Sequence, residues 1–197
     1  MTRFVIVVDT QADFMGAGGA LAVPGAEALA EPMQAWLGRL VPEETAGVLF
    51  TYDSHEADRY GDSAEARLFP PHCLRGTPGW ENVLDAAGLA PEIARYRLEK
   101  DVFDMWAEPD SEVEDMRTGA LHPRDAFFGG LLSRGVSEVT VIGVAADYCV
   151  LWAVAGLVAR GFSVRVPRGL TRGIVRQIDA VAAEEFGDGA LSVDDEA

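Results

Sequence analysis

Three short runs of mainly apolar, often β-branched residues constrain the fold of this 197-residue chain more than any other feature. They span residues 4–8, 48–52 and 139–144. Continuous apolar runs, without a polar residue at every second position, are typical of strands that are buried on both faces of a parallel sheet. The first two runs end directly before aspartates, Asp9 and Asp53. We therefore expect a central parallel sheet with polar groups where its strands end.

Weaker strand signals and helical patterns extend this sheet. Strands are predicted at residues 92–98, 163–166 and 191–193, and residues 104–123 are expected to form an acidic loop. Helices are predicted at residues 27–40, where Pro32 weakens the pattern, and at 124–134, from about 147 onward, and at 173–186. Alternating strands and helices predict an α/β fold, with three α/β/α layers around a mostly parallel six-stranded sheet. The length favours one domain over residues 1–197.

Composition excludes several classes of partner. A net charge of −16 argues against nucleic acid and against anionic membrane surfaces, because both are bound through basic patches. No apolar run approaches the length of a membrane span, and residues 4–8 are too few for the core of a signal peptide. Two cysteines do not make a disulfide framework, so we expect a cytoplasmic protein. A homo-oligomer is compatible with these features.

Cys149 is the candidate nucleophile. It follows the strand at residues 139–144 and falls in the first turn of a helix that begins near Asp147. The helix dipole and the free N–H groups there are expected to lower the pKa of the thiol and favour the thiolate. Asp147 itself is interpreted as an acidic residue at the helix N-terminus. The alternative for Cys149 is a small buried hydrophobic residue.

Asp9, Asp53, Lys100 and Cys149 each lie at or just past the carboxyl end of a predicted strand, where ligands bind in such sheets. Lys100 is the only lysine among 16 basic residues. A thiolate nucleophile needs a base or a cationic partner, and acyl transfer needs donors to the developing oxyanion. Asp9 could exchange protons with Cys149 while Lys100 orients Asp9. The backbone N–H groups of Ala145 and Cys149 could form the oxyanion hole.

A second cluster suggests a metal. Asp53 and His55 are separated by one residue, and His72 follows in the stretch Phe69-Pro70-Pro71-His72. One carboxylate and two imidazoles suit a divalent ion such as zinc, iron or manganese. Glu65 could add an oxygen ligand. Solvated loop residues are the alternative.

Three motifs together carry a family resemblance. Residues 9–14 with 18–21, residues 69–73 with 76–79, and residues 143–150 resemble, in order, motifs of the nicotinamidases in the isochorismatase-like cysteine hydrolase superfamily. The resemblance covers nearly the whole chain and implies the isochorismatase-like, Rossmann-like fold. It also implies hydrolysis of nicotinamide to nicotinate and ammonia through a thioester on Cys149.

Roles for individual residues follow from the same resemblance. Asp9 would transfer protons, Lys100 would complete the triad, and the Val144–Ala145 peptide would be cis. The metal would bind the pyridine nitrogen of nicotinamide. The substrate site would be formed by aromatic side chains stacked on the ring, unless these are plain core residues, and by the turn before the cysteine: Phe14, Phe69, Val144 and Ala145.

The chain also departs from the family pattern. Residues 56–61 hold no histidine, whereas many members have one there, and Glu65 matches an acidic ligand of some relatives. The segment after Lys100 is longer and more acidic than expected, and Trp106 is interpreted as its anchor. The nearest alternative is a related, metal-independent cysteine amidase acting on an N-carbamoyl or ureido substrate. A non-catalytic metal-binding protein with the same fold is a second alternative.

Overall fold

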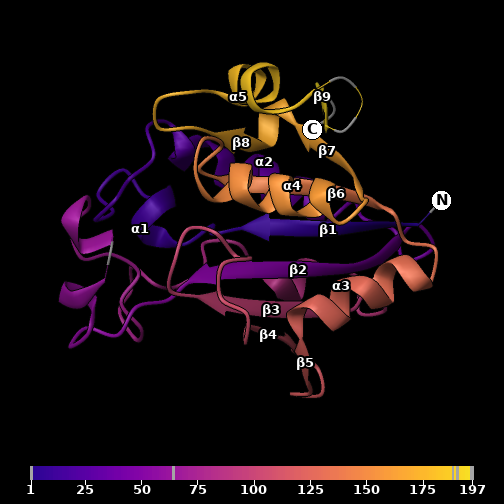
Figure 1. Ribbon diagram of the computed structural model, residues 1–197, viewed down its shortest axis with the longest axis horizontal. Helices are drawn as coiled ribbons and strands as arrows, with labels where there is room; N and C mark the ends of the chain where they lie inside the picture. Colours follow the sequence, from indigo (N-terminus) through magenta and orange to yellow (C-terminus); the bar gives the residue numbers. More distant parts are fainter. Residues whose placement is uncertain (1, 64, 188, 190, 196–197) are drawn as a thin grey trace.

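A computed structural model describes residues 2–63, 65–187, 189 and 191–195, and a single sheet runs through it (Figure 1). The sheet has nine strands in the order β5-β4-β3-β2-β1-β6-β7-β9, with β8 beside β6. The six predicted strands are all present, and each is parallel to its neighbours among the six. They are β1 (Arg3–Val8), β2 (Thr45–Asp53), β3 (Arg95–Lys100), β6 (Glu138–Val144), β7 (Ser163–Pro167) and β9 (Leu191–Asp194).

The predicted strand count was wrong, because three short strands join these six. β4 (Glu112–Asp115) and β5 (Leu121–Pro123) form an antiparallel extension of β3, where a loop was predicted. β8 (Thr171–Arg172) pairs with the end of β6. In β4 only Val113 is buried, and all of β5 is exposed. Such short strands, which are mostly not buried, contain too few apolar residues in succession for the sequence to reveal them.

Helices cover both faces of the sheet, as predicted, and β1 shows how the two faces are built. Phe4, Ile6 and Val8 share a core with α3 (Arg124–Ser133), α4 (Cys149–Ala159) and α5 (Ile178–Glu185). Val5 and Val7 share a second core with α1 (Ala12–Met15) and α2 (Ala30–Leu37). In Figure 1 α3 and α4 lie in front of the sheet and α2 lies behind it. Both faces of β1 are therefore buried, which explains its uninterrupted apolar sequence.

Two helix boundaries differ from the prediction. The helix expected at residues 27–40 is a 3₁₀ turn, η1 (Ala26–Leu29), followed by α2. Pro32 lies in the first turn of α2, where its missing N–H leaves no intrahelical bond unmade. α5 begins at Ile178, five residues later than predicted. The other 3₁₀ turns are η2 (Tyr60–Asp62), η3 (Glu65–Arg67), η4 (Ala86–Gly88) and η5 (Arg168–Leu170).

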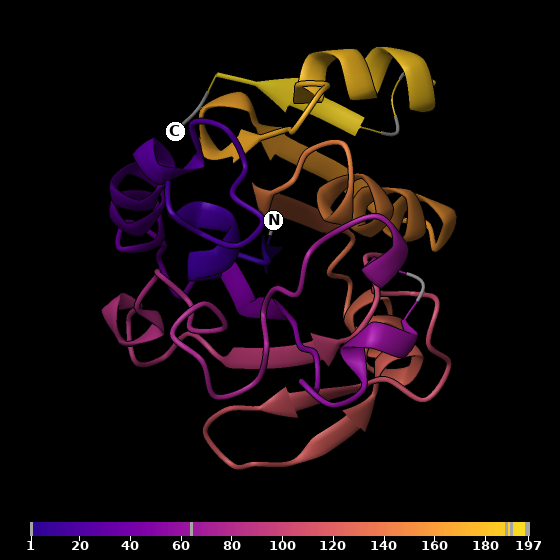
Figure 2. The same ribbon diagram turned by 90° about the vertical axis from the view of Figure 1, so that its left-hand side faces the viewer.

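The carboxyl ends of the parallel strands meet at one edge, toward the viewer in Figure 2. Asp53 pairs with Lys100 across β2 and β3, and Val8 pairs with Gly143 across β1 and β6. Gly143 has φ +118°, and a Cβ there would lie 2.1 Å from the Val8 oxygen. A glycine is therefore required where β6 passes the end of β1.

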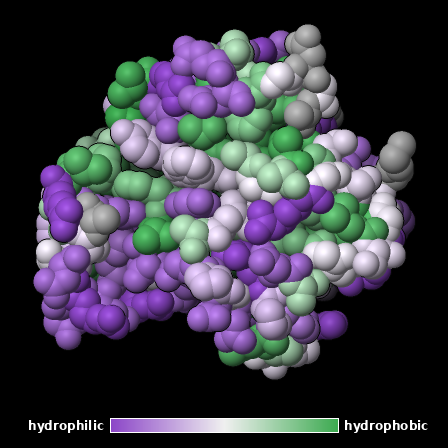
Figure 3. All heavy atoms as spheres, viewed as in Figure 1, coloured by the Kyte–Doolittle hydropathy of each residue, from purple (hydrophilic) through white to green (hydrophobic). Residues whose placement is uncertain are grey.

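The surface over η2 and η3, at the lower left of Figure 3, is largely hydrophilic. In the described part of the chain, no helix has the length and apolar character needed to cross a membrane.

Candidate active site

Asp9 and Lys100 form a buried ion pair at the carboxyl edge of the sheet. Lys100 Nζ lies 2.7 Å from Asp9 Oδ2, and the two residues are 3% and 0% exposed. Thr51 in β2 donates its hydroxyl to Asp9 Oδ1 at 2.6 Å and accepts the Asp9 N–H at 3.2 Å. Asp9 has φ +48°, in the left-handed region that an aspartate tolerates better than most residues. The carboxylate is thus held at both oxygens.

Cys149 completes the group beside Lys100. Its Sγ lies 3.8 Å from Lys100 Nζ, and the residue is 4% exposed. It is the first residue of α4, as predicted. The preceding Val144–Ala145 peptide is cis, as the resemblance implied. Neither the Ala145 nor the Cys149 N–H donates to another described residue, so both remain available as donors.

The electrostatics of the site correct one prediction. Burial raises the pKa of the Cys149 thiol well above its usual range; the Lys100 ammonium opposes this shift, and the carboxylates of Asp9 and Asp53 reinforce it. Burial lowers the pKa of Lys100, but the neighbouring carboxylates and thiol outweigh it and raise that pKa. The expected lowering of the Cys149 pKa at the helix N-terminus is therefore wrong in the metal-free protein. Burial, reinforced by two nearby carboxylates, outweighs the partial charge of a helix dipole.

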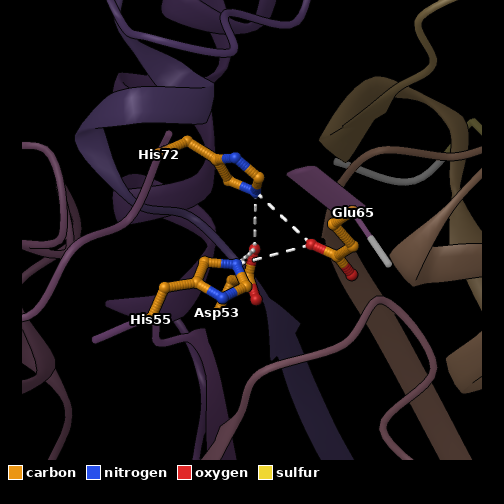
Figure 4. A group of neighbouring side chains, drawn as sticks. All are labelled: Asp53, His55, Glu65 and His72. Atoms are coloured by element: carbon orange, nitrogen blue, oxygen red, sulfur yellow. Dashed lines mark hydrogen bonds and ion pairs between the residues drawn. The ribbon is translucent and has the colours of Figure 1, made fainter. Parts of the chain in front are cut away.

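The predicted metal ligands meet next to this group (Figure 4). One ligand atom each from Asp53, His55, Glu65 and His72 lies within 4.8 Å of all the others, and all four residues are buried. Asp53 Oδ2 lies 3.3 Å from His55 Nε2 and 3.0 Å from His72 Nε2. Glu65 Oε2 lies 3.4 Å and 3.7 Å from the same two nitrogens. Glu65, which sequence reasoning left as an optional ligand, is thus placed as the fourth member.

These residues fit a divalent ion. Metal–ligand distances of about 2.0–2.2 Å place tetrahedral ligand atoms about 3.3–3.6 Å apart, close to the separations here. Asp53 Oδ1, His55 Nε2 and Glu65 Oε2 are buried without a hydrogen-bond partner among the described residues. His72 Nδ1 lies 2.8 Å from the Pro70 oxygen, a contact that directs the Nε2 lone pair toward the cluster. Burial lowers the pKa of His55, but Asp53 and Glu65 outweigh it and raise that pKa to about 9, so the cluster attracts positive charge.

A narrow apolar cavity borders Cys149. The four predicted substrate-binding residues all line it, namely Phe14, Phe69, Val144 and Ala145. Phe14 lies 5.4 Å from the His72 ring, so the cavity borders the metal cluster as well.

Several contributing residues were not predicted. Phe103, Tyr148 and Ile174 also line the cavity, and only their positions in the fold reveal this. The Gln11 side-chain amide donates to the backbone carbonyl oxygen of Asp53 at 2.7 Å and accepts the backbone N–H of Asp53 at 2.8 Å, which fixes the end of β2. Trp106 does not line the cavity; it packs against Phe128 on α3, in agreement with its interpretation as an anchor.

The geometry is that of a class of protein, the α/β cysteine hydrolases, with the candidate nucleophile beside a metal-type cluster. No protein-family model matches the chain. The chain is 32% identical to the nicotinamidase/pyrazinamidase of Mycobacterium tuberculosis over 189 residues, which cover 93% of this chain and 94% of the relative. This identity and coverage show that the chain belongs to the nicotinamidase/pyrazinamidase family, as the sequence motifs predicted.

Solved structures agree on the fold. The pyrazinamidase of Pyrococcus horikoshii in complex with zinc has a TM-score of 0.73 at 24% identity, covering 98% of each chain. The PnC1 protein of L. infantum in complex with nicotinate has a TM-score of 0.72 at 26% identity, covering 98% of this chain and 91% of that one. The isochorismatase-like fold is therefore confirmed.

Proposed function

We propose that this protein hydrolyses nicotinamide to nicotinate and ammonia through a thioester on Cys149. The observation that carries the proposal is the position of Lys100 Nζ, 2.7 Å from the Asp9 carboxylate and 3.8 Å from the Cys149 sulfur. An acid, an amine and a thiol from separate strand ends thus meet at one buried point, beside the apolar cavity. Membership of the nicotinamidase/pyrazinamidase family supports the choice of substrate.

Acylation begins with a protonated thiol, because burial and the nearby carboxylates keep the pKa of Cys149 high. Asp9 takes this proton as the sulfur attacks the amide carbon, and the carbonyl electron pair moves onto oxygen. The Ala145 and Cys149 N–H groups, which have no other described acceptor, donate to that oxyanion. As the C–N bond breaks, Asp9 returns the proton to the nitrogen, and ammonia leaves behind a thioester.

Hydrolysis of the thioester uses the same groups in reverse order. Asp9 takes a proton from water, and the resulting hydroxide attacks the thioester carbon. The C–S bond breaks, the sulfur recovers a proton from Asp9, and the nicotinic acid formed loses its carboxyl proton to solvent and leaves as nicotinate. Throughout, Lys100 keeps its proton and orients the Asp9 carboxylate, since neighbouring negative groups raise the pKa of its ammonium.

Asp53, His55, Glu65 and His72 would hold one divalent ion. Their two imidazoles and two carboxylates suit zinc, and also iron or manganese. A bound ion would supply a Lewis acid for the pyridine nitrogen and so favour a ring with that nitrogen over a plain aromatic amide. Phe14 and Phe69 line the cavity beside it and offer apolar faces to the ring.

The decisive experiment measures ammonia and nicotinate from nicotinamide, beside metal analysis of the purified protein. Cys149→Ala is expected to abolish turnover, because the nucleophile is lost. Asp9→Asn is expected to reduce turnover by about 10³-fold or more, because it removes the proton-transfer group and its ion pair with Lys100. Acid quenching followed by intact-mass measurement should detect a nicotinoyl adduct on the wild-type protein. Metal-loaded wild type that leaves nicotinamide intact would overturn the proposal.

Chelation separates this function from the ureido-amidase alternative. Nicotinamide turnover should disappear on metal removal and return with zinc, iron or manganese, whereas a metal-independent amidase would keep its activity on an N-carbamoyl compound. The buried four-residue cluster favours the metal-dependent reaction.

A further inference from the structure

Asp147 does not cap the helix that carries the nucleophile. Tyr148 is the N-cap residue of α4, and its side chain makes no capping hydrogen bond. The Asp147 carboxylate, 8% exposed, turns instead toward the segment at residues 173–176. Its interpretation as an acidic residue of the helix N-terminus was therefore wrong, and its actual partners point to another role.

Both oxygens of Asp147 bind backbone N–H groups of this segment. Oδ1 accepts from Ile174 at 2.8 Å, and Oδ2 accepts from Val175 at 2.8 Å and from Arg176 at 2.9 Å. Three successive backbone donors converge on one carboxylate 27 to 29 residues earlier in the chain. Hydrogen bonds to an ionised acceptor are the stronger kind, so the carboxylate holds the segment as a unit.

The two residues before Gly173 are also hydrogen-bonded to the turn that precedes Cys149. Thr171 donates its hydroxyl to the Gly143 oxygen at 2.8 Å, and the Ala146 N–H donates to the Arg172 oxygen at 2.8 Å. Gly173 lies in the turn between these two bonds and the three hydrogen bonds from residues 174–176 to the Asp147 carboxylate, which we call the clamp. A Cβ on Gly173 would lie 1.8 Å from the Arg176 oxygen and 3.0 Å from Asp147 Oδ1, so the turn excludes any larger residue.

Ile174 links this clamp to the substrate. Its side chain lines the apolar cavity together with Ala145 and Cys149, while its N–H is held by Asp147. We propose that Asp147 is a positioning residue for specificity: its carboxylate fixes residues 173–176 so that Ile174 forms one wall of the cavity. The proposed substrate role of the cavity underlies this inference; the clamp itself does not depend on it.

Amide hydrogen exchange tests the clamp without any substrate. In Asp147→Asn the side chain keeps one acceptor and places an N–H₂ group against backbone donors, so the amides of residues 174–176 should exchange about tenfold faster or more. The control is Asp179→Asn, which removes an exposed carboxylate on α5 that pairs with Arg168. Unchanged exchange in Asp147→Asn would overturn the clamp.

Steady-state kinetics test the consequence for binding. If the clamped segment is populated one-tenth of the time in Asp147→Asn, the KM for nicotinamide and the Kd for nicotinate should each rise about tenfold, with kcat within about threefold of wild type. A fall in kcat at constant KM would overturn the positioning role. The same holds for a shifted pH profile of Cys149 alkylation by iodoacetamide, since that result would mean that Asp147 acts on the thiol.

A double-mutant cycle with Ile174→Ala shows whether the two residues act together. If Asp147 acts through Ile174, the double variant should raise KM little more than the larger single effect, whereas additive effects would refute the connection. Should Asp147→Asn fail to fold, Gly173→Ala disrupts the same turn and should reproduce the rise in KM and the faster exchange. Wild type that neither binds nicotinate nor turns over nicotinamide would refute the proposed function, and the exchange result would still decide the clamp.

Discussion

Replacing Lys100 with methionine removes the positive charge beside two buried carboxylates, and we expect a loss of both stability and activity. The Lys100 side chain is 1% exposed and lies 2.7 Å from Asp9 and 3.8 Å from Asp53, both fully buried. Removing one partner of a buried ion pair costs about 3–5 kcal/mol, because the other charge remains without compensation. Since proteins are stable by about 5–15 kcal/mol in total, this is a large share of the free energy of unfolding.

Adding Asp9→Asn to Lys100→Met separates stability from catalysis. Asparagine removes the stranded charge and can still accept the Thr51 hydroxyl, so the double variant should regain at least about half of the lost stability. It should remain inactive, because the group that moves the proton is gone. Urea denaturation of the zinc-loaded proteins, followed by circular dichroism, gives the free energies, and ammonia release gives the activity.

Arg97→Met is the matched control, since it makes a similar change on the same strand. The Arg97 side chain is 34% exposed and pairs with Glu114 at 2.7 Å, so its loss should cost no more than about 1 kcal/mol. Two results would refute the reasoning. One is a Lys100→Met protein within about 1 kcal/mol of wild type. The other is a double variant that is less stable than Lys100→Met itself.

Three further predictions test the metal cluster, the thiol and the packing. Glu65→Gln should weaken zinc binding about tenfold or more in a chelator competition, whereas Glu56→Gln, an exposed neighbour of the cluster, should not. Because the pKa of Cys149 is raised, its alkylation by iodoacetamide in the metal-free protein should keep rising above pH 8; a plateau below pH 7 would indicate a preformed thiolate. Gly156→Ala should lower the thermal midpoint, since its Cβ would lie 2.0 Å from a tryptophan nitrogen, while Gly129→Ala, with open space around it, should raise it.

The sheet and the triad could be predicted from the sequence because both depend on strongly patterned residues. Strands buried on both faces must be apolar at successive positions, as at residues 4–8 and 139–144. Parallel strands place their carboxyl ends at one edge, so residues that follow different strands meet there without any knowledge of the loops. Asp9, Lys100 and Cys149 were predicted in this way.

The remaining features depend on contacts that no local pattern encodes. Asp147 has its partners 27 to 29 residues later in the chain, and a residue directly before a helix is more simply interpreted as a helix-end acid. The pKa of Cys149 depends first on burial and then on two carboxylates from other strands, which oppose the effect of the helix dipole that the local sequence suggests. Both errors arose where tertiary electrostatics and hydrogen bonding outweigh local preference.

Glu65 and the segment after Lys100, where the sequence is expected to depart from the family pattern, belong to one structural feature. Glu65 Oε1 accepts the N–H of Phe103 at 2.9 Å, which leaves Oε2 facing the histidines of the cluster.

The segment that carries Phe103 is anchored by Trp106, whose ring lies 3.8 Å from the Arg160 guanidinium carbon. Arg124, which is 2% exposed, donates to the backbone carbonyl oxygens of Met105 and Glu108 at 2.8 and 2.7 Å. A glutamate side chain has more rotamers than a histidine side chain. It therefore needs a second contact to hold one carboxylate oxygen toward a metal. The segment after Lys100 supplies that contact and, through Phe103, also part of the wall of the cavity. A change in this segment should therefore affect metal affinity and substrate binding together.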